Sequence, residues 1–297
     1  MLMRVLSVGS CTLDHLGVVE RFAEPNLKAE MSKFSVQGGG CAATAIAALA
    51  RWGVETKFIG KVGNDPRGKL IESTLADEGV DTSDMIHEEG AISQFRFVLI
   101  ESGSGRKQTV YTRGSVSGLE PDEIDVSVLD DVDLLLVDGK QKAAQLELMR
   151  EAKKRGITVM FEANRSQRDA AELVANADCL VASERFASQF AGVGRLESLC
   201  RALLDRGPCR VIVTMGDEGV VGMDADAQEM IRQEAHPVDV VDTTGAGDIF
   251  LGALAYGLLH EWDFAHMIEF ANKAAALSCT DIGGRSAIFS IAEIQES

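Results

Sequence analysis

The sequence has no apolar run long enough to cross a membrane, and it has few basic residues for its size. No uninterrupted hydrophobic stretch approaches the ~18–20 residues that a transmembrane helix needs. The 29 Lys and Arg residues are outnumbered by 46 Asp and Glu residues, which gives a formal net charge of −17 at pH 7. A chain this acidic repels DNA, RNA and anionic lipid. These deficits disfavour a nucleic-acid-binding protein and a membrane protein.

Paired cysteines and a secretory signal are also lacking. The cysteines show no Cys-x-x-Cys spacing and no nearby pair of histidines: Cys11, Cys41, Cys179, Cys200, Cys209 and Cys279. In a chain of 297 residues this scatter favours free, mostly buried thiols over a disulfide framework or a zinc site. The start of the chain, Met1–Gly9, is a short apolar run interrupted by Arg4, which predicts a first β-strand and not a signal peptide. We therefore expect a cytoplasmic protein.

What the chain does contain is a repeating pattern of apolar strand, Gly-rich turn and amphipathic helix. Alternation of this kind predicts a mainly parallel sheet with helices on both faces, formed by residues 1–297 as a single domain. The expected strands are Val5–Gly9, Glu55–Ile59, Leu134–Val137, Thr158–Phe161, Cys179–Val181, Val211–Thr214 and Val220–Met223. The expected helices are Cys41–Trp52, Lys69–Glu78, Ala143–Arg155, Ala170–Asn176, Leu196–Arg206, Asp248–Leu259 and Phe264–Cys279.

Two segments depart from this pattern. Gly17–Val36 and Ser93–Thr112 alternate apolar and polar residues and have no helical period. The second contains the turn Ser102–Gly105 between two alternating runs, which is typical of a β-hairpin. We expect a small antiparallel layer, one face of which must be covered by the main domain, a ligand or a second subunit.

The strongest functional signal is Asp242-Thr243-Thr244-Gly245-Ala246-Gly247-Asp248, which follows a strand-like run from Val238 and opens a helix at Asp248. A Gly-rich helix start directs unpaired N–H groups at one point, where an anion can bind. A carboxylate there can act as a general base in phosphoryl transfer, or it can simply cap the helix. Asp242 and Thr244 are either turn-forming residues or oxygen ligands of a cation.

A second Gly-rich segment, Gly38-Gly39-Gly40, leads into the helix at Cys41 and predicts close approach of the backbone to a small molecule. It also fits the dinucleotide fingerprint, but it does not follow the first strand, where that fingerprint belongs.

Residues Gly63–Leu70 resemble a phosphate-binding loop, yet Leu70 replaces the required hydroxyl residue, so we expect a polar turn. Asp14 follows the first strand, and it either binds sugar hydroxyls or caps a loop.

These motifs, together with Gly60-Lys61-Val62-Gly63-Asn64-Asp65, resemble the PfkB (ribokinase-like) carbohydrate kinases in order and spacing over essentially the whole chain. The resemblance implies a three-layer α/β/α sandwich with a β-lid near residues 15–36 and 92–114, and transfer of the ATP γ-phosphate to a sugar hydroxyl. It implies Asp248 as the general base and the N–H groups of Gly245, Ala246 and Gly247 as the anion hole. By position it also implies sugar contacts from Asp14, Gly38, Gly39 and Gly40, nucleotide contacts from Thr214, Gly216, Gly219, Asn272 and Ser183, and a K⁺ site at Asp242 and Thr244.

The chain departs from the family pattern in two places. Ala43 stands where many relatives have an Asn that contacts the sugar. Ser183 and Phe186 stand where many have Asn-x-x-Glu, which positions Mg²⁺, so either Glu184 substitutes or the metal is held mainly by nucleotide oxygens and water. Three segments look most similar to the sulfofructose kinase and ketohexokinase branch: Gly38–Thr44, Val238–Thr244 and Cys279–Arg285. In that case Lys28, Arg113 and Lys140 would bind an anionic ketose such as 6-sulfofructose, or they would be solvated surface residues.

Three functions remain open from the sequence alone. The first is an ATP- and Mg²⁺-dependent kinase for a ketose or related sugar, including ribose or a nucleoside. The second is a sugar- or nucleotide-binding relative without useful catalysis, because Asn-x-x-Glu is missing. The third is an NAD-linked oxidoreductase. The lid also predicts closure over the substrate and a homodimer formed through the lid.

Overall fold

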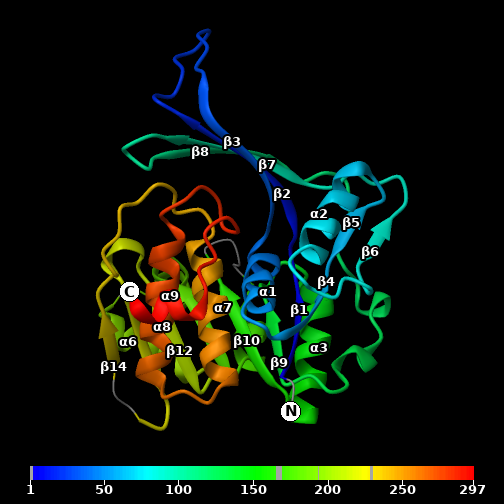
Figure 1. The fold of residues 1–297 in the computed structure, drawn as a ribbon. Coiled ribbons are helices and arrows are strands. Elements are labelled where there is room, and N and C mark those ends of the chain that lie inside the picture. Colours follow the sequence, from blue (N-terminus) through cyan, green and yellow to red (C-terminus); the bar gives the residue numbers. More distant parts are fainter. Residues whose placement is uncertain (1–2, 165–168, 193, 228–229) are drawn as a thin grey trace.

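In the computed structural model of the protein, which describes all residues except 1–2, 165–168, 193 and 228–229, a large sheet runs through the body (Figure 1). Its eight described strands, in spatial order, are β14 (Met230–Gln233), β13 (Val220–Asp224), β12 (Arg210–Thr214), β11 (Cys179–Ser183), β10 (Thr158–Ala163), β9 (Leu134–Val137), β1 (Arg4–Val8) and β4 (Glu55–Ile59). The strands from β12 to β4 are parallel, whereas β13 and β14 are antiparallel additions at one edge. The predicted mainly parallel sheet is confirmed.

Helices cover both faces of this sheet, because successive strand residues point to opposite sides and both sides are apolar. Val5 belongs to one buried cluster and Leu6 to the other. On the first face lie α1 (Cys41–Arg51), α7 (Ala246–Leu259), α8 (Phe264–Ser278) and α9 (Ile291–Glu296). On the second face lie α3 (Lys142–Arg155), α4 (Ala171–Asn176), α5 (Glu184–Ala191) and α6 (Leu196–Leu204), with 3₁₀ turns at Pro121–Glu123, Val126–Leu129 and Gly216–Glu218.

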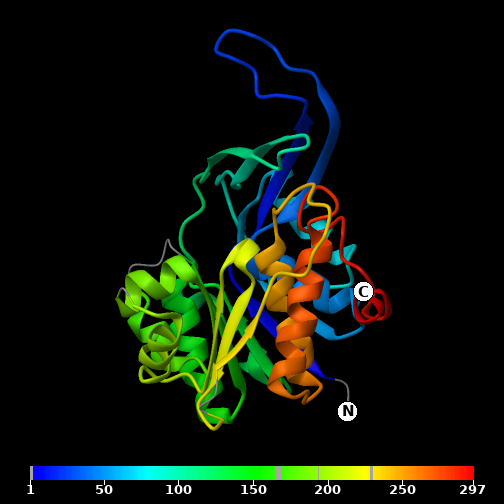
Figure 2. The ribbon, with the colours of Figure 1, turned by 90° about the vertical axis from the view of Figure 1, so that its left-hand side faces the viewer.

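A second sheet projects from the body above one end of the strands (Figures 1 and 2). Its order is β3 (Met31–Gly39), β2 (Thr12–Val19), β7 (Phe95–Glu101), β8 (Lys107–Thr112). The two segments without helical period therefore form the lid, and the hairpin β7–β8 is where the alternation predicted it. The layer is not purely antiparallel, because β2 pairs with β7 in parallel. The first lid segment also begins earlier and ends later than Gly17–Val36, so that Gly38 and Gly39 lie within β3.

The two faces of the lid sheet differ in their surroundings. Leu16, Val18, Val98 and Ile100 form a buried cluster with Ile282 of the segment after α8. On the opposite face, His15 stacks on Phe97 with ring centroids 4.8 Å apart. That outer face leaves large apolar side chains exposed: Met31, Phe34, Val36, Phe97 and Val110.

Several local features differ from the sequence expectations. Helix α2 (Pro66–Ala76) begins before Lys69, because Asp65 caps it by accepting a hydrogen bond of 2.8 Å from the Gly68 N–H. The loop-like motif Gly63–Leu70 is thus largely a helix start. No strand forms over residues 238–241, where backbone groups bond to the Cys279 carbonyl, as the Val241 N–H does at 2.8 Å. The helices α5 and α9 and the short strands β5 (Lys61–Gly63), β6 (Ile86–Glu88) and β14 had not been expected.

Among the described residues, no helix is long and apolar enough to cross a membrane. This agrees with the absence of a long apolar run in the sequence.

Glycine is required at position 40, where the chain turns from β3 into α1. Gly40 has φ 101°, and an added Cβ would lie 2.2 Å from the Ser10 carbonyl oxygen. Gly53, at the other end of α1, has φ 84° and open space around an added Cβ. A backbone with positive φ costs an L-residue about 1–2 kcal/mol at either position. Only Gly40→Ala also creates a steric overlap, with the Ser10 carbonyl oxygen, which costs about 1–3 kcal/mol more. Urea denaturation should show Gly40→Ala as the more destabilised variant by that margin, and equal losses would contradict the structure.

Candidate active site

Helix α7 begins in the motif that joins Asp242 to Asp248. Gly245, with φ 82°, precedes the first turn, and the helix starts at Ala246, two residues before the predicted start at Asp248. An added Cβ at Gly245 would lie 2.4 Å from Gly284 Cα, whereas one at Gly247 would meet nothing within 4 Å. The Ala246 N–H donates to the Thr243 carbonyl at 3.4 Å. The side-chain direction of Gly247 is open, and a helix start with open space beside it is the arrangement that an anion-binding site requires.

Asp248 lies in the first turn of α7, is half-buried, and does not cap the helix. Burial raises the pKa of its carboxyl above the usual range of an aspartate. A hydrogen bond with the Cys41 thiol and the charge of Arg96 oppose this rise, while Asp14 and Asp138 reinforce it. A carboxylate with a raised pKa in the first turn of a helix suits general-base chemistry.

Asp14 lies in β2, and not directly at the end of the first strand. Its carboxylate is buried and forms a two-bond ion pair with Arg96 of β7, in which Nε donates to Oδ1 at 2.7 Å and Nη2 donates to Oδ2. The Thr12 hydroxyl donates to the same Oδ1 at 2.7 Å. These hydrogen bonds fix the Asp14 carboxylate, which is close enough to Asp248 to affect the pKa of that residue. The remaining oxygen lone pairs of Asp14 are available to a ligand.

The glycine triplet lies between two guanidinium groups. An added Cβ at Gly39 would be 2.2 Å from Asp14 Oδ2 and 2.7 Å from Arg96 Nη2. An added Cβ at Gly38 would be 2.3 Å from Nη1 of Arg285. The sequence analysis did not assign Arg96 or Arg285 to the site: Arg96 stands in no local motif, and Arg285 was noted only as the end of the segment Cys279–Arg285.

Further carboxyl groups follow the central strands. Asp138, directly after β9, is fully buried and accepts hydrogen bonds from Ser10 N (2.8 Å) and Ser10 Oγ (2.6 Å). Glu162, near the end of β10, has its pKa raised to about 8 by burial, with further contributions from Asp248 and Asp138. The sequence analysis missed both, although polar residues at the carboxyl ends of buried parallel strands are a recognisable signal of a ligand site.

The residues predicted for the nucleotide lie on neighbouring elements. Thr214 ends β12 and is registered with Ser183 of β11, whose hydroxyl caps α5 by accepting from Phe186 N at 3.2 Å. Gly216 and Gly219 bound the 3₁₀ turn after β12 with positive φ. Asn272 of α8 donates to the Glu234 carbonyl at 2.6 Å, close to where a Cβ on Gly219 would lie. Glu184 is exposed at the start of α5.

Asp242 is completely buried beneath the start of α7. Its Oδ1 accepts from Thr244 N (2.9 Å) and Thr244 Oγ1 (2.7 Å), and its Oδ2 accepts from Gly283 N (2.9 Å). Lys107 of the lid hairpin donates to the hydroxyls of Thr243 and Thr244 at 3.0 and 3.3 Å. Within the described residues there is no group of three or more His, Cys, Asp or Glu side chains arranged to hold a metal ion.

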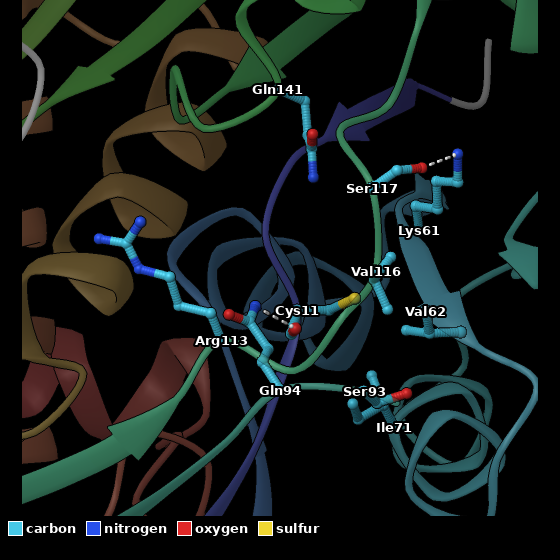
Figure 3. A pocket seen from close by; sticks show the side chains of 10 residues that line it. All are labelled: Cys11, Lys61, Val62, Ile71, Ser93, Gln94, Arg113, Val116, Ser117 and Gln141. Carbon is cyan, nitrogen blue, oxygen red and sulfur yellow. Dashed lines mark hydrogen bonds between the residues drawn. The ribbon is translucent and has the colours of Figure 1, made fainter. Parts of the chain in front are cut away.

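The three cations predicted for an anionic ketose lie on different segments. Lys28 is exposed in the loop between β2 and β3, which extends away from the body in Figures 1 and 2. Lys140 donates to Asn164 Oδ1 at 3.3 Å. Arg113 borders a cavity of about 80 Å³, beside which the Gln94 amide donates to the Cys11 carbonyl and the Lys61 ammonium to the Ser117 hydroxyl (Figure 3). The expected convergence of Lys28 with the other two is not seen.

Comparison with known proteins identifies the family of the chain. Residues 3–290 match the pfkB family of carbohydrate kinases. An ATP-dependent ribose-1-phosphate kinase from Halopiger xanaduensis is 29% identical over 96% of this chain and 95% of its own length. Fructokinase-1 of Zea mays is 27% identical over 98% of this chain and 96% of its own. A ribokinase II-type structure from E. coli in complex with ATP and Mg²⁺ has the same fold (TM-score 0.86, 23% identity, 99% and 98% coverage).

The ribokinase-like α/β fold with its separate small β-sheet is thus confirmed, whereas nothing in the comparisons singles out the sulfofructose kinase and ketohexokinase branch. With a match over nearly the whole chain, the protein belongs to the pfkB family of carbohydrate kinases, which transfer phosphate from ATP to a sugar hydroxyl.

Proposed function

We propose that the protein phosphorylates a ketose or related furanose sugar, with Asp248 as the general base. The observation that carries this proposal is the position of Asp248 in the first turn of α7, beside the open space at Gly247 and close enough to Asp14 for that carboxylate to affect its pKa. A sugar held by Asp14 and by the backbone of Gly38–Gly40 presents a hydroxyl to Asp248. The base removes the hydroxyl proton as the oxygen attacks the γ-phosphorus and ADP leaves.

The chain stabilises the transferring phosphoryl group mainly through backbone. The N–H groups of Gly245, Ala246 and Gly247 donate to its oxygens, and the dipole of α7 adds to this effect. Thr214, Gly216, Gly219, Asn272 and Ser183 hold the nucleotide along the edge formed by β11, β12 and α8. Open space in front of Gly247 fits this role, because nothing in the described chain fills it.

Mg²⁺, bound together with ATP, neutralises charge on the phosphate oxygens. The described residues lack a cluster of metal ligands, so we propose that nucleotide oxygens and water supply most of its ligands and that the exposed Glu184 carboxylate acts through water. The predicted K⁺ site at Asp242 and Thr244 stays a prediction. A K⁺ ion there would have to share oxygens that already accept from Thr244 N–H, Gly283 N–H and Lys107.

Removal of the Asp248 carboxylate tests the proposed mechanism. Asp248→Ala should lower kcat by about 10²–10⁴-fold, the range expected for loss of a general base. ADP release with ATP and Mg²⁺ is measured against fructose, 6-phospho and 6-sulfo ketoses, ribose and nucleosides. A matched control is Asp263→Ala, which removes the cap of α8 (His266 N to Asp263 Oδ1, 3.0 Å) and should affect stability but not turnover. Unchanged turnover in Asp248→Ala would exclude this role.

The pH dependence of the reaction reports the environment of Asp248. The base must be deprotonated, and its pKa is raised, so kcat/KM should begin to fall at a higher pH than that of an exposed aspartate, about 4. Arg96 stabilises the charged form. Arg96→Met should therefore move the acid limb to still higher pH, because the cation is lost and Asp14 becomes an uncompensated negative neighbour.

An NMR titration and a control variant support the comparison of Arg96→Met with the unaltered protein. NMR titration of ¹³C-labelled aspartate carboxyls follows Asp248 directly in both proteins. Arg106→Met is the control, since Arg106 pairs with Glu101 in the lid hairpin and should leave the profile unchanged. An acid limb that stays in place or moves to lower pH in Arg96→Met would show that Arg96 does not act on the base.

We further propose that the protein forms a homodimer through the outer face of the lid. This face exposes Phe34, Phe97 and Val110 by 53%, 43% and 66%, around the half-buried ring of His15. Apolar clusters of this kind on a projecting sheet are typical of association surfaces. On the other face of the lid, Leu16, Val18, Val98 and Ile100 are already buried against Ile282, whereas the outer face is free to meet a second copy.

Light scattering at micromolar concentration tests this interface. The unaltered protein should have the mass of a dimer, and Phe97→Glu should convert it to a monomer by placing charge on the apolar face. Leu70→Glu is the control, because Leu70 is equally exposed (43%) but lies on α2, outside the lid. A monomeric parent protein would refute the proposed dimer, as would a dimer that persists in Phe97→Glu.

A further inference from the structure

Lys107, at the start of β8 in the lid hairpin, reaches the segment that leads into α7. Its ammonium donates to the hydroxyls of Thr243 and Thr244 at 3.0 and 3.3 Å. The turn of the hairpin lies over the same segment, since an added Cβ at Gly105 would be 3.7 Å from a methyl group of Val240. Figure 1 shows the hairpin extending above this part of the body. A cation of the lid is therefore placed directly before the glycines at which α7 begins.

The Thr244 hydroxyl connects this ammonium to a buried carboxylate. It accepts from Lys107 and donates to Asp242 Oδ1 at 2.7 Å. Asp242 is completely buried, and it also accepts from the backbone N–H groups of Thr244 and Gly283. All three of these donors are neutral, and Lys107 brings a positive charge one hydroxyl away.

The negative charge of Asp242 is unfavourable for phosphoryl transfer at this helix start. Asp242 precedes Gly245, at which the proposed anion hole begins, and Asp248 adds a second carboxyl group in the first turn of α7. Phosphate oxygens bound at that turn would be repelled by both charges. Burial of a carboxylate without a compensating cation is also costly. A positive charge beside Asp242 therefore reduces the repulsion where the transferring group binds.

The K⁺ ion predicted at Asp242 and Thr244 would supply such a charge, but the oxygens there do not fit it. Oδ1 of Asp242 already accepts two hydrogen bonds and Oδ2 accepts one. The Thr244 hydroxyl directs its proton at Asp242 and a lone pair at Lys107. A K⁺ ion would share this hydroxyl with an ammonium, and two like charges in contact with one oxygen repel each other. The arrangement suits a fixed ammonium and not a second cation.

We propose that the Lys107 ammonium takes the place of a monovalent cation at the start of α7, so that the enzyme needs no K⁺. The inference rests on the proposed function, which places the transferring phosphoryl group at the N–H groups of this helix start. Lys107 acts through Thr244 and Asp242 and not on the reacting atoms, so it is a positioning residue. Because it belongs to the lid, its charge reaches the helix start only while the hairpin rests on the segment before α7.

Exchange of the monovalent cation in the assay tests the proposal. ADP release by the unaltered protein should be the same in the chlorides of potassium, sodium and N-methylglucamine at equal ionic strength. Lys107→Ala should lower kcat about 10-fold or more when N-methylglucamine is the only monovalent cation, because the charge is lost while the rest of the site remains. Potassium or ethylammonium chloride should restore most of kcat, since either cation can occupy the space that the side chain leaves.

Lys33→Ala is the matched control. Lys33 is also a lid lysine that reaches the body, where it pairs with Asp281 at 2.5 Å. Its loss removes one charge and one lid contact but leaves Thr243 and Thr244 unchanged, so kcat should gain no dependence on K⁺. Activation of the unaltered protein by K⁺ would overturn the proposal, as would unchanged turnover in Lys107→Ala. So would a loss in Lys107→Ala that neither K⁺ nor ethylammonium reverses, or the same response to K⁺ in Lys33→Ala.

Thermal unfolding supplies a readout that does not depend on catalysis. Replacing N-methylglucamine by K⁺ at constant ionic strength should raise the unfolding temperature of Lys107→Ala more than that of the parent or of Lys33→Ala, because only Lys107→Ala leaves the oxygens of Asp242 and Thr244 to a free cation. Lys107→Ala is expected to fold, since Lys107 is exposed at the start of β8. Equal responses of the three proteins to K⁺ would contradict the proposal.

The two readouts separate this inference from the proposed function. If no sugar elicits ADP release from the unaltered protein, the kinase proposal fails, while the unfolding temperatures still decide whether Lys107 replaces a cation. If a sugar is phosphorylated only when K⁺ is present, the kinase proposal stands and the inference fails.

Discussion

The ion pair between Asp14 and Arg96 is the interaction on which the site depends. It joins β2 and β7, two strands that are far apart in the sequence and pair in parallel, and thereby connects the two halves of the lid sheet. Its bulk requires glycine at position 39, because any side chain there would overlap Asp14. Its charges also act on Asp248 in opposite directions, Arg96 favouring the carboxylate and Asp14 opposing it. One pair thus links lid geometry, the backbone of the glycine triplet and the protonation of the catalytic base.

The elements that sequence analysis predicted well are those whose signals are local. Leu134–Val137 is apolar throughout because it is covered on both faces, and Gly245 marks a helix start because the backbone turns there with positive φ. The lid followed from alternation within single segments. By contrast, the pairing of Arg96 with Asp14 and the approach of Arg285 to Gly38 bring together residues separated by 82 and about 250 positions, and no local pattern encodes such contacts.

The wrong predictions also concern segments whose backbone structure is not determined by local composition alone. The Val238–Val241 run has the composition of a strand, but no strand of the sheet lies beside it, so its backbone bonds to the end of α8 at Cys279 instead. Residues Gly63–Leu70 were expected to form a polar turn, yet Pro66 is accepted in the first turn of a helix, where its missing N–H is not needed.

The site combines carboxyl groups with a guanidinium, whereas the chain as a whole has a net charge of −17. Asp14, Asp138, Glu162 and Asp248 converge at the ends of the parallel strands, and a site with only these carboxyls would repel both ATP and an anionic sugar. Glu162, with a pKa of about 8, relieves part of this repulsion by retaining its proton at neutral pH. Arg96 neutralises Asp14 through their two-bond ion pair, so the repulsion that an anionic nucleotide meets at the site is smaller than the number of carboxyl groups alone implies.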